Sequence, residues 1–175
     1  MVHLHCMSSN VSLYSLKTGA ASIGDGERMP TPEKSEVMKN VLKTLISISS
    51  RKTDLPYALM TMDDLIKRLE PRYEFLKLVQ INDDVYNEET ANLVSVMSDI
   101  NTVPPTEMGK ALHAIIESMN RSLGDRAGHF FIKEIRNTLN DEYLFIMKTM
   151  GVDLGMMQLE SEIIRLERDI AERKK

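Results

Sequence analysis

The chain of 175 residues has no tryptophan, a single cysteine and few aromatic side chains, which make up 5% of the sequence. One cysteine excludes a framework of internal disulfides and favours a reducing compartment, so we expect a cytoplasmic protein. No apolar run approaches the roughly 18 residues of a membrane-spanning helix, and we expect no membrane association. The N-terminus lacks the basic and then apolar segments of a secretory signal.

Excess positive charge is also missing. The formal net charge is −4 and the isoelectric point is about 5.6, which argues against a surface built throughout for nucleic acid. Hydrophobic residues make up 42% of the chain and charged residues 27%. These proportions are typical of an ordinary globular protein with enough apolar side chains for a core.

Residue patterns typical of catalysis or metal binding are sparse. His3, His5 and Cys6 are closely spaced metal-ligand types, but no second cluster completes a zinc site. His113 and Glu117 lie one helical turn apart without the second histidine of a helical zinc motif. The sequence therefore predicts no catalytic residues, no metal, no cofactor and no enzymatic activity.

Composition divides the chain into an irregular N-terminal arm and a helical remainder. Residues 1–31 are rich in serine and glycine, and we expect them to be ordered only by docking on their own body, on a second copy or on a lattice neighbour. The second possibility predicts a homodimer formed through the arm. Apolar stripes with helical spacing follow, in 32–100 and in 107–175, separated by a linker at 101–106 that contains Pro104 and Pro105.

Several helix boundaries can be predicted from single residues. Pro32 suits the start of the first helix, the spacing of Thr61 and Asp64 suits the start of the next, and Asn87 and Asn140 suit the starts of later ones. Gly124 and Gly151 are expected to end helices. Residues 72–81 fit a helix and a strand equally well.

The two helical segments resemble each other at a constant offset of 70 residues, which aligns 37–100 with 107–170 without a gap. The identical pairs are Met38/Met108, Leu42/Leu112, Ile46/Ile116, Arg51/Arg121, Leu69/Leu139, Tyr73/Tyr143, Phe75/Phe145, Asp83/Asp153, Asp99/Asp169 and Ile100/Ile170. Two amphipathic runs that share phase by chance would explain the apolar matches. That alternative explains the arginine, tyrosine and aspartate pairs less well.

A tandem duplication predicts an all-α protein of two four-helix repeats, packed about a pseudo-two-fold axis. It also assigns 72–81 to a helix, because the matching 142–151 reads as one. Tyr73 and Tyr143 are then equivalent, and each is expected to fill the core with its hydroxyl reaching a polar partner.

Basic side chains are the main difference between the two halves. Repeat one carries Arg51, Lys52, Lys67, Arg68, Arg72 and Lys77 where repeat two has mostly uncharged residues. Such a face could contact phosphates or an acidic partner protein. A solvated surface is favoured, because residues 37–100 contain eight Lys and Arg against ten Asp and Glu, a net charge of −2. Residues 61–69 also fit a helix of a winged helix-turn-helix, although the acidic 82–89 argues against a DNA-facing wing.

The last predicted helix carries a heptad seam, formed by Met156, Leu159, Ile163, Leu166 and Ile170. The positions that flank it are all acidic, namely Glu160, Glu162, Glu167 and Asp169. Like charges would oppose each other if two copies paired along this seam. The pattern therefore favours a basic partner helix or packing within the molecule, and the repeat favours the second.

Taken together, these patterns predict a non-enzymatic helical protein-interaction or regulatory module. One alternative is a DNA-binding regulator that uses the basic residues of repeat one. Another is a small-molecule sensor with a pocket between the repeats.

Overall fold

The computed structural model describes residues 32–82, 93–124, 128 and 130–173, which all belong to one compact unit. The arm at 1–31, with the homodimer predicted through it, lies outside these residues. The α-helices are α1 (Lys34–Lys52), α2 (Leu55–Leu69), α3 (Pro105–Leu123), α4 (Phe131–Thr138), α5 (Asp141–Thr149) and α6 (Leu154–Arg173). The predicted helical architecture is confirmed, with the addition of one small sheet. In the described part of the chain, no helix has both the length and the apolar character to cross a membrane.

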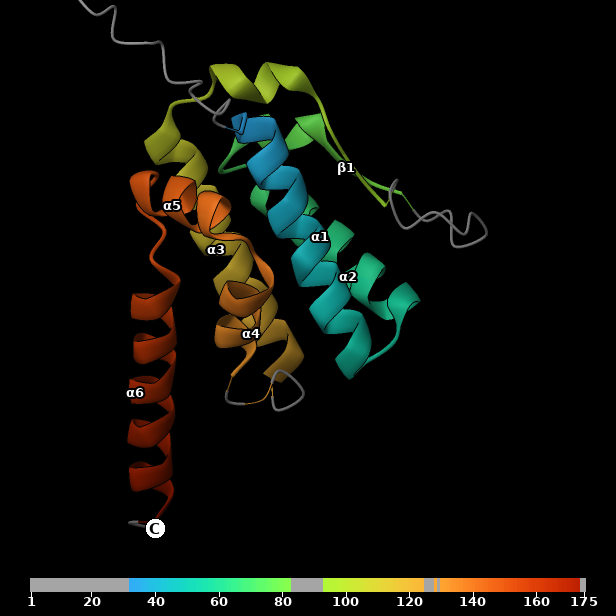
Figure 1. Ribbon diagram of the computed structural model, residues 1–175. Helices are drawn as coiled ribbons and strands as arrows, with labels where there is room; N and C mark the ends of the chain where they lie inside the picture. The colour runs from blue at the N-terminus through green and yellow to red at the C-terminus, as the bar shows by residue number, and fades with distance from the viewer. Residues whose placement is uncertain (1–31, 83–92, 125–127, 129, 174–175) are drawn as a thin grey trace, which may run out of the picture. The chain divides into compact units, whose positions relative to one another are not determined.

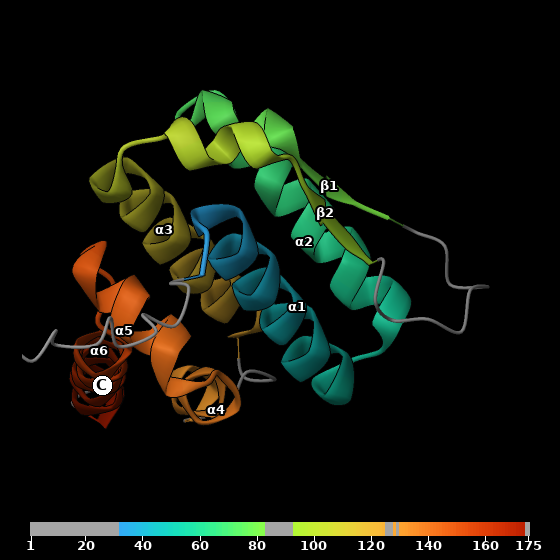
Figure 2. The same ribbon diagram turned by 45° about the horizontal axis from the view of Figure 1, so that its top comes forward.

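Helix α1 is the centre of the fold. It packs against α2, α3, α4 and the sheet, and Figure 2 shows it between α2 and α3 (Figure 1, Figure 2). Because α1 has neighbours on several sides, buried residues occur around much of its circumference. They are Val37, Met38, Val41, Leu42, Thr44, Leu45, Ile46, Ile48 and Ser49. The buried Ser49 hydroxyl donates to the Leu45 carbonyl at 2.7 Å, so its burial leaves no unmet hydrogen bond.

A two-stranded antiparallel sheet occupies part of repeat one. Strands β1 (Val79–Ile81) and β2 (Val94–Val96) pair Val79 with Val96 and Ile81 with Val94. The 3-10 helices η1 (Glu74–Leu78) and η3 (Ser98–Thr102) flank the sheet. The helices predicted over 72–81 and from Asn87 are therefore wrong at β1 and β2, and only short 3-10 helices, η1 and η3, form in these segments. Both strands alternate buried and exposed positions, and β-branched residues with a period of two fit a strand covering α1 and α2.

Helix ends were predicted with mixed success. Asn140 caps α5 as expected, with its Oδ1 accepting from the Tyr143 amide at 2.9 Å. Gly124 follows α3 and Gly151 follows α5, both with positive φ, of 51° and 91°. The start of α2 at Thr61 was wrong, because Asp54 caps that helix and accepts from the Tyr57 amide at 2.8 Å.

The predicted linker joins the two halves into one core. Asn101 accepts from the Ser35 amide at 2.8 Å and donates to Glu33 Oε2 at 2.7 Å. Lys34 also donates to the carbonyl of Val103. Residues 101–103 therefore hold the N-terminal end of α1 in place.

The two halves correspond in burial over their first helices. Met38 and Met108, Leu42 and Leu112, and Ile46 and Ile116 are all buried. Beyond Leu69 and Leu139 the correspondence is lost, since Ile100 is fully buried while Ile170 is 55% exposed. The first half therefore lacks the four helices predicted for it. The complete tandem repeat about a pseudo-two-fold axis stays a prediction.

Tyr73 and Tyr143 make reciprocal contacts between the halves. The Tyr143 hydroxyl donates to Glu36 Oε1 on α1 at 3.0 Å and accepts from Asn40 Nδ2 at 3.0 Å. The Tyr73 hydroxyl donates to the carbonyl of Lys110 on α3 at 3.4 Å. Positions 40 and 110 are themselves 70 residues apart, so each tyrosine reaches the same place on the other half.

Candidate functional site

The first turn of α6 is held by Asp153. Its Oδ1 accepts from the amides of Met156 at 3.2 Å and Gly155 at 2.9 Å, and Lys148 Nζ lies 3.6 Å from Oδ2. The Met156 amide first, then the Gly155 amide and Lys148, lower the pKa of this carboxyl below its usual range. A charged cap at the positive end of the helix dipole therefore fixes where α6 begins.

Only one side of α6 packs on the protein. Leu154 and Met157 are buried, and α4 is the main neighbour (Figure 1). Gln158 Oε1 accepts from the Lys133 amide at 3.2 Å, and Asn120 Nδ2 lies 3.4 Å from Ser161 Oγ. All these α6 residues precede Glu162, and the C-terminal half of α6 extends beyond α4 in Figure 1.

The predicted heptad seam faces away from the packed side. With 100° per residue, its centre lies roughly 170° around the helix from the mean direction of Leu154, Met157 and Ser161. Its members are 47–55% exposed, and they are Met156, Leu159, Ile163, Leu166 and Ile170. The expectation that the seam packs within the molecule was wrong. Leu154 and Met157 belong to the core and Gln158 binds the backbone of α4, so the core is closed without the seam.

The acidic residues border the exposed seam on both sides. By helical geometry, Glu160 and Glu167 lie along one edge, and Glu162 and Asp169 along the other. Glu162 accepts from Gln158 Nε2 at 2.7 Å, an interaction that leaves its charge in place. The candidate site is thus an apolar stripe between two rows of carboxylates, which we call the α6 seam.

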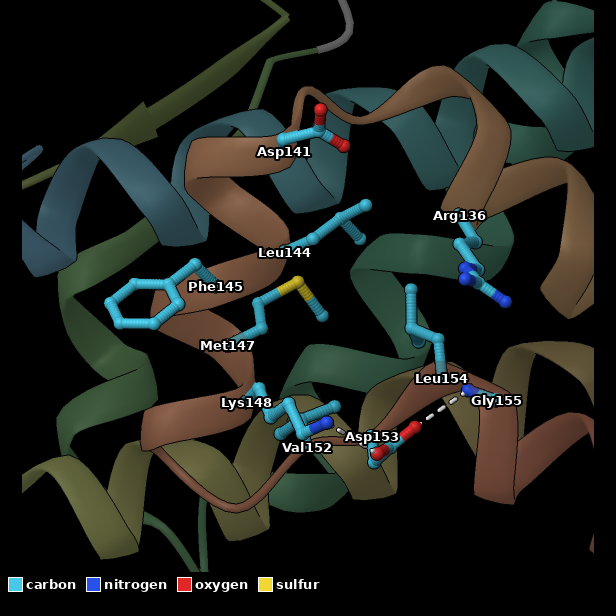
Figure 3. Close-up of a pocket in the computed structure, with 10 residues that line it drawn as sticks. All are labelled: Arg136, Asp141, Leu144, Phe145, Met147, Lys148, Val152, Asp153, Leu154 and Gly155. Carbon is cyan, nitrogen blue, oxygen red and sulfur yellow. Dashed lines mark hydrogen bonds and ion pairs between the residues drawn. The ribbon is translucent and has the colours of Figure 1, made fainter.

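A hollow of about 330 Å³ lies beside the first turn of α6 (Figure 3). Leu144, Phe145 and Met147 of α5 form one wall, and Leu154 and Gly155 of α6 lie across from them. Phe145 is 69% exposed although its counterpart Phe75 packs against the core. The lining also includes Arg136, Lys148 and Asp153 and contains no residue of the α6 seam, and the spacing of residues in the sequence gave no sign of this hollow.

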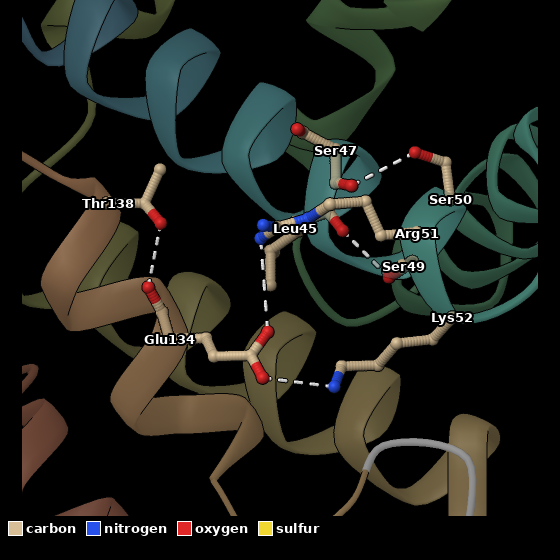
Figure 4. A network of polar contacts seen from close by, with 8 residues as sticks. All are labelled: Leu45, Ser47, Ser49, Ser50, Arg51, Lys52, Glu134 and Thr138. Atoms are coloured by element: carbon tan, nitrogen blue, oxygen red, sulfur yellow. Dashed lines mark hydrogen bonds and ion pairs between the residues drawn. The ribbon is translucent and has the colours of Figure 1, made fainter.

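Two of the six predicted basic residues bind an acidic residue of the other half. Lys52 Nζ lies 3.0 Å from Glu134 Oε1, and Arg51 lies 3.9 Å from Glu134 Oε2 (Figure 4). Glu134 belongs to α4, so this network ties α4 to the end of α1. Arg51 and Lys52 therefore have a structural partner.

The other four basic residues lie elsewhere. Lys67 pairs with Asp63 at 2.6 Å and Lys77 with Glu74 at 3.2 Å, while Arg72 stacks over the ring of Tyr73 at 5.3 Å. Lys67 and Arg68 lie in the last turn of α2, whereas Arg51 and Lys52 precede its first residue. The two pairs are therefore separated by the length of α2, which is about 20 Å for 15 residues. The six residues are thus divided between two ends of α2. The hairpin follows α2, as in a winged helix, but the acidic 83–89 lies outside the described residues.

Of the metal-ligand residues considered in the sequence, His3, His5 and Cys6 lie outside the described residues, and His113 and Glu117 lie one turn apart on α3. Glu117 pairs with Arg121 at 2.6 Å, and no three His, Cys, Asp or Glu in the described residues are arranged to hold a metal ion.

Comparison with known proteins adds no relative. No family model matches the chain. No significant match is found among curated proteins or among solved structures. The α6 seam is therefore interpreted from its own chemistry.

Proposed function

We propose that the protein is a non-enzymatic, cytoplasmic interaction module that binds a partner helix along the α6 seam. The observation that carries the proposal is the half-exposure of five apolar side chains on one face of α6, whose opposite face is packed only in the N-terminal half, at Leu154 and Met157. Exposed apolar stripes of this kind are costly in water and are typical of interaction surfaces. Covering the exposed half of each Leu or Ile is worth about 1 kcal/mol, before the cost of association.

The acidic residues beside the α6 seam indicate which kind of helix would bind there. Carboxylates on both edges of the α6 seam would face carboxylates in a second copy, whether the two helices ran parallel or antiparallel. A partner helix with its own apolar seam and with Lys or Arg at the flanking positions would pair favourably along both edges. Basic residues border the helices that lie on anionic membranes, so the acidic edges also favour a protein partner over a lipid surface.

The proposal includes the tandem duplication. The reciprocal contacts of Tyr73 and Tyr143 with positions 110 and 40 support it, because chance agreement of helical phase does not require matched contacts between halves. In this view α6 and the segment that contains β2 and η3 diverged from a common element. The half that kept a long helix gained the α6 seam.

DNA binding is the weaker alternative. Four of the six basic residues predicted for it lie within ion-pair distance of carboxylates, and the set is divided along α2. Phosphate contacts would have to displace those partners. A sensor role depends on a different part of the surface, a cavity lined by Arg72, Lys110 and His113.

A pair of synthetic helical peptides tests the proposal on the full-length protein. Both peptides carry Ile and Leu in a heptad seam; one has Lys at the flanking positions and the other has Glu. Fluorescence anisotropy should show that the Lys peptide binds at least about tenfold more tightly, with affinity falling as salt rises. Ile163→Glu should abolish binding, because it places a charge in the middle of the α6 seam.

Met60→Glu is the matched control, since Met60 on α2 is exposed to the same degree as the seam residues. This variant should bind the Lys peptide as the wild type does. Binding that survives Ile163→Glu, or equal affinity for the two peptides, would overturn the proposal. So would a homodimer, measured by sedimentation, that Ile163→Glu dissociates, because a second copy would then occupy the α6 seam.

A further inference from the structure

A second cavity, of about 450 Å³, lies where the two halves meet. Arg72 and Tyr73 follow α2, Lys110 and His113 come from α3, and Met150 and Gly151 follow α5. Three segments far apart in the sequence thus form its walls. Arg72, Tyr73, His113 and Gly151 were each considered in the sequence, but for other roles, and nothing there predicted that they share a cavity.

The floor of the cavity is a direct contact between backbones. A Cβ atom on Gly109 would lie 1.9 Å from the carbonyl oxygen of Met150, so only glycine allows α3 to approach the end of α5 this closely. Tyr73 is buried beside this contact, and its hydroxyl donates to the carbonyl of Lys110. The contact and the buried ring hold the walls in place.

The cavity lining carries more basic than acidic side chains, although the protein as a whole has a net negative charge. Within the described part of the chain, Arg72, Lys110 and His113 form no ion pair with a carboxylate. Glu117, the acidic residue of the lining, is bound by Arg121 at 2.6 Å. Stacking on Tyr73 holds the Arg72 guanidinium at the cavity, where it can present paired N–H donors.

The corresponding place on the other side of the molecule shows what such a site accepts. There the Tyr143 hydroxyl contacts the carboxylate of Glu36 at 3.0 Å. At the offset of 70 residues, Glu36 corresponds to Thr106, which lines the cavity beside Tyr73. One tyrosine therefore has a carboxylate supplied by the chain, and the other has a neutral residue in a cavity whose lining includes Arg72 and Lys110.

We propose that this cavity binds a small molecule through a carboxylate, which occupies the place that Glu36 takes beside Tyr143. Arg72 and Lys110 bind the carboxylate, His113 donates a hydrogen bond to it, and the Tyr73 ring forms an apolar wall. The comparison with Glu36 rests on the tandem duplication in the proposed function, but the site is separate from the α6 seam, and its failure would leave the partner-helix proposal untouched.

Isothermal titration calorimetry of the full-length protein with succinate, citrate and inorganic phosphate, at low salt, tests the assignment. At least one of the two carboxylates should bind more tightly than phosphate. Arg72→Gln and Lys110→Gln should each weaken binding about tenfold or more, since a hydrogen bond to a charged group is lost in each case. Thr106→Glu should abolish binding, because it places a carboxylate of the chain in the cavity.

Arg68→Gln is the matched control: Arg68 is exposed on the last turn of α2 and is absent from the lining. It should leave the affinity unchanged, and circular dichroism should show the same helix content in all variants. The assignment is overturned if neither carboxylate binds, if phosphate alone binds, if Arg68→Gln is as harmful as Arg72→Gln, or if Thr106→Glu still binds.

Discussion

Tyr143 on α5 donates a hydrogen bond to Glu36 on α1, with 3.0 Å between the hydroxyl oxygen and Oε1. The two residues are 107 positions apart in the sequence, so this bond fixes a helix of the second half against the central helix of the first. Burial first, and then the bond to Glu36, raise the pKa of Tyr143 above its ordinary value of 10.0. The neutral hydroxyl is therefore the form that the folded protein favours.

Tyr143→Phe should lower the free energy of unfolding by about 1 kcal/mol at neutral pH, the usual value of one such bond. Because the pKa is raised in the folded state, this contribution is complete below pH 10.0 and is lost as the pH rises through the raised value. Urea unfolding should therefore show the difference between wild type and variant shrinking in alkaline solution. Tyr73→Phe removes a longer bond, of 3.4 Å, and should cost less. A Tyr143→Phe difference that grows above pH 10.0 would contradict the assignment.

Gly109→Ala should destabilise the protein by about 2 kcal/mol or more, because the new methyl group overlaps the backbone of Met150 and α3 must move away from α5. Thermal unfolding followed by circular dichroism measures the loss. Ser122→Ala, at an exposed position on the same helix, should change stability by no more than about 0.5 kcal/mol. Equal stability of the two variants would mean that the close approach does not exist.

Replacing a side chain by alanine should reduce stability on the packed face of α6 and have little effect on the exposed face. Met157→Ala should cost about 2 kcal/mol or more, because Met157 is buried against the protein. Leu159→Ala should leave stability within about 0.5 kcal/mol of the wild type, because its side chain is half exposed on the α6 seam. Chemical denaturation of dilute protein measures both. A large loss from Leu159→Ala alone would show that the seam is covered in the free protein.

Glu134→Gln should reduce stability by no more than about 1 kcal/mol, since Arg51 and Lys52 meet Glu134 near the surface. The effect should be greatest at low salt and should fade as salt is added. The same variant releases both cations, so a gel shift at low salt also tests the DNA alternative. Binding that appears only in Glu134→Gln would show that α4 masks a phosphate-binding surface, whereas we expect none in either protein.

Local sequence patterns were sufficient to predict most of the α-helices and the apolar side of each. The stripes of α1 and α3, the cap at Asn140 and the endings at Gly124 and Gly151 depend on interactions within a few residues. Residues 79–81 could not be assigned this way, because Val79 and Ile81 suit either structure until β2 pairs with them. The repeat misled the prediction there, since similarity to a helical segment does not preserve the partner that a strand requires.

The sequence by itself determined the composition of the α6 seam and its acidic edges, because a heptad pattern is a property of one helix. Whether that stripe is covered was decided only by the tertiary structure, in which Leu154 and Met157 take the packed side and leave the stripe in water. The cavity at Arg72, Lys110 and His113 depended on the fold in the same way. Its walls come from segments far apart in the sequence that only tertiary packing brings together. The spacing of residues within one segment therefore could not predict the cavity.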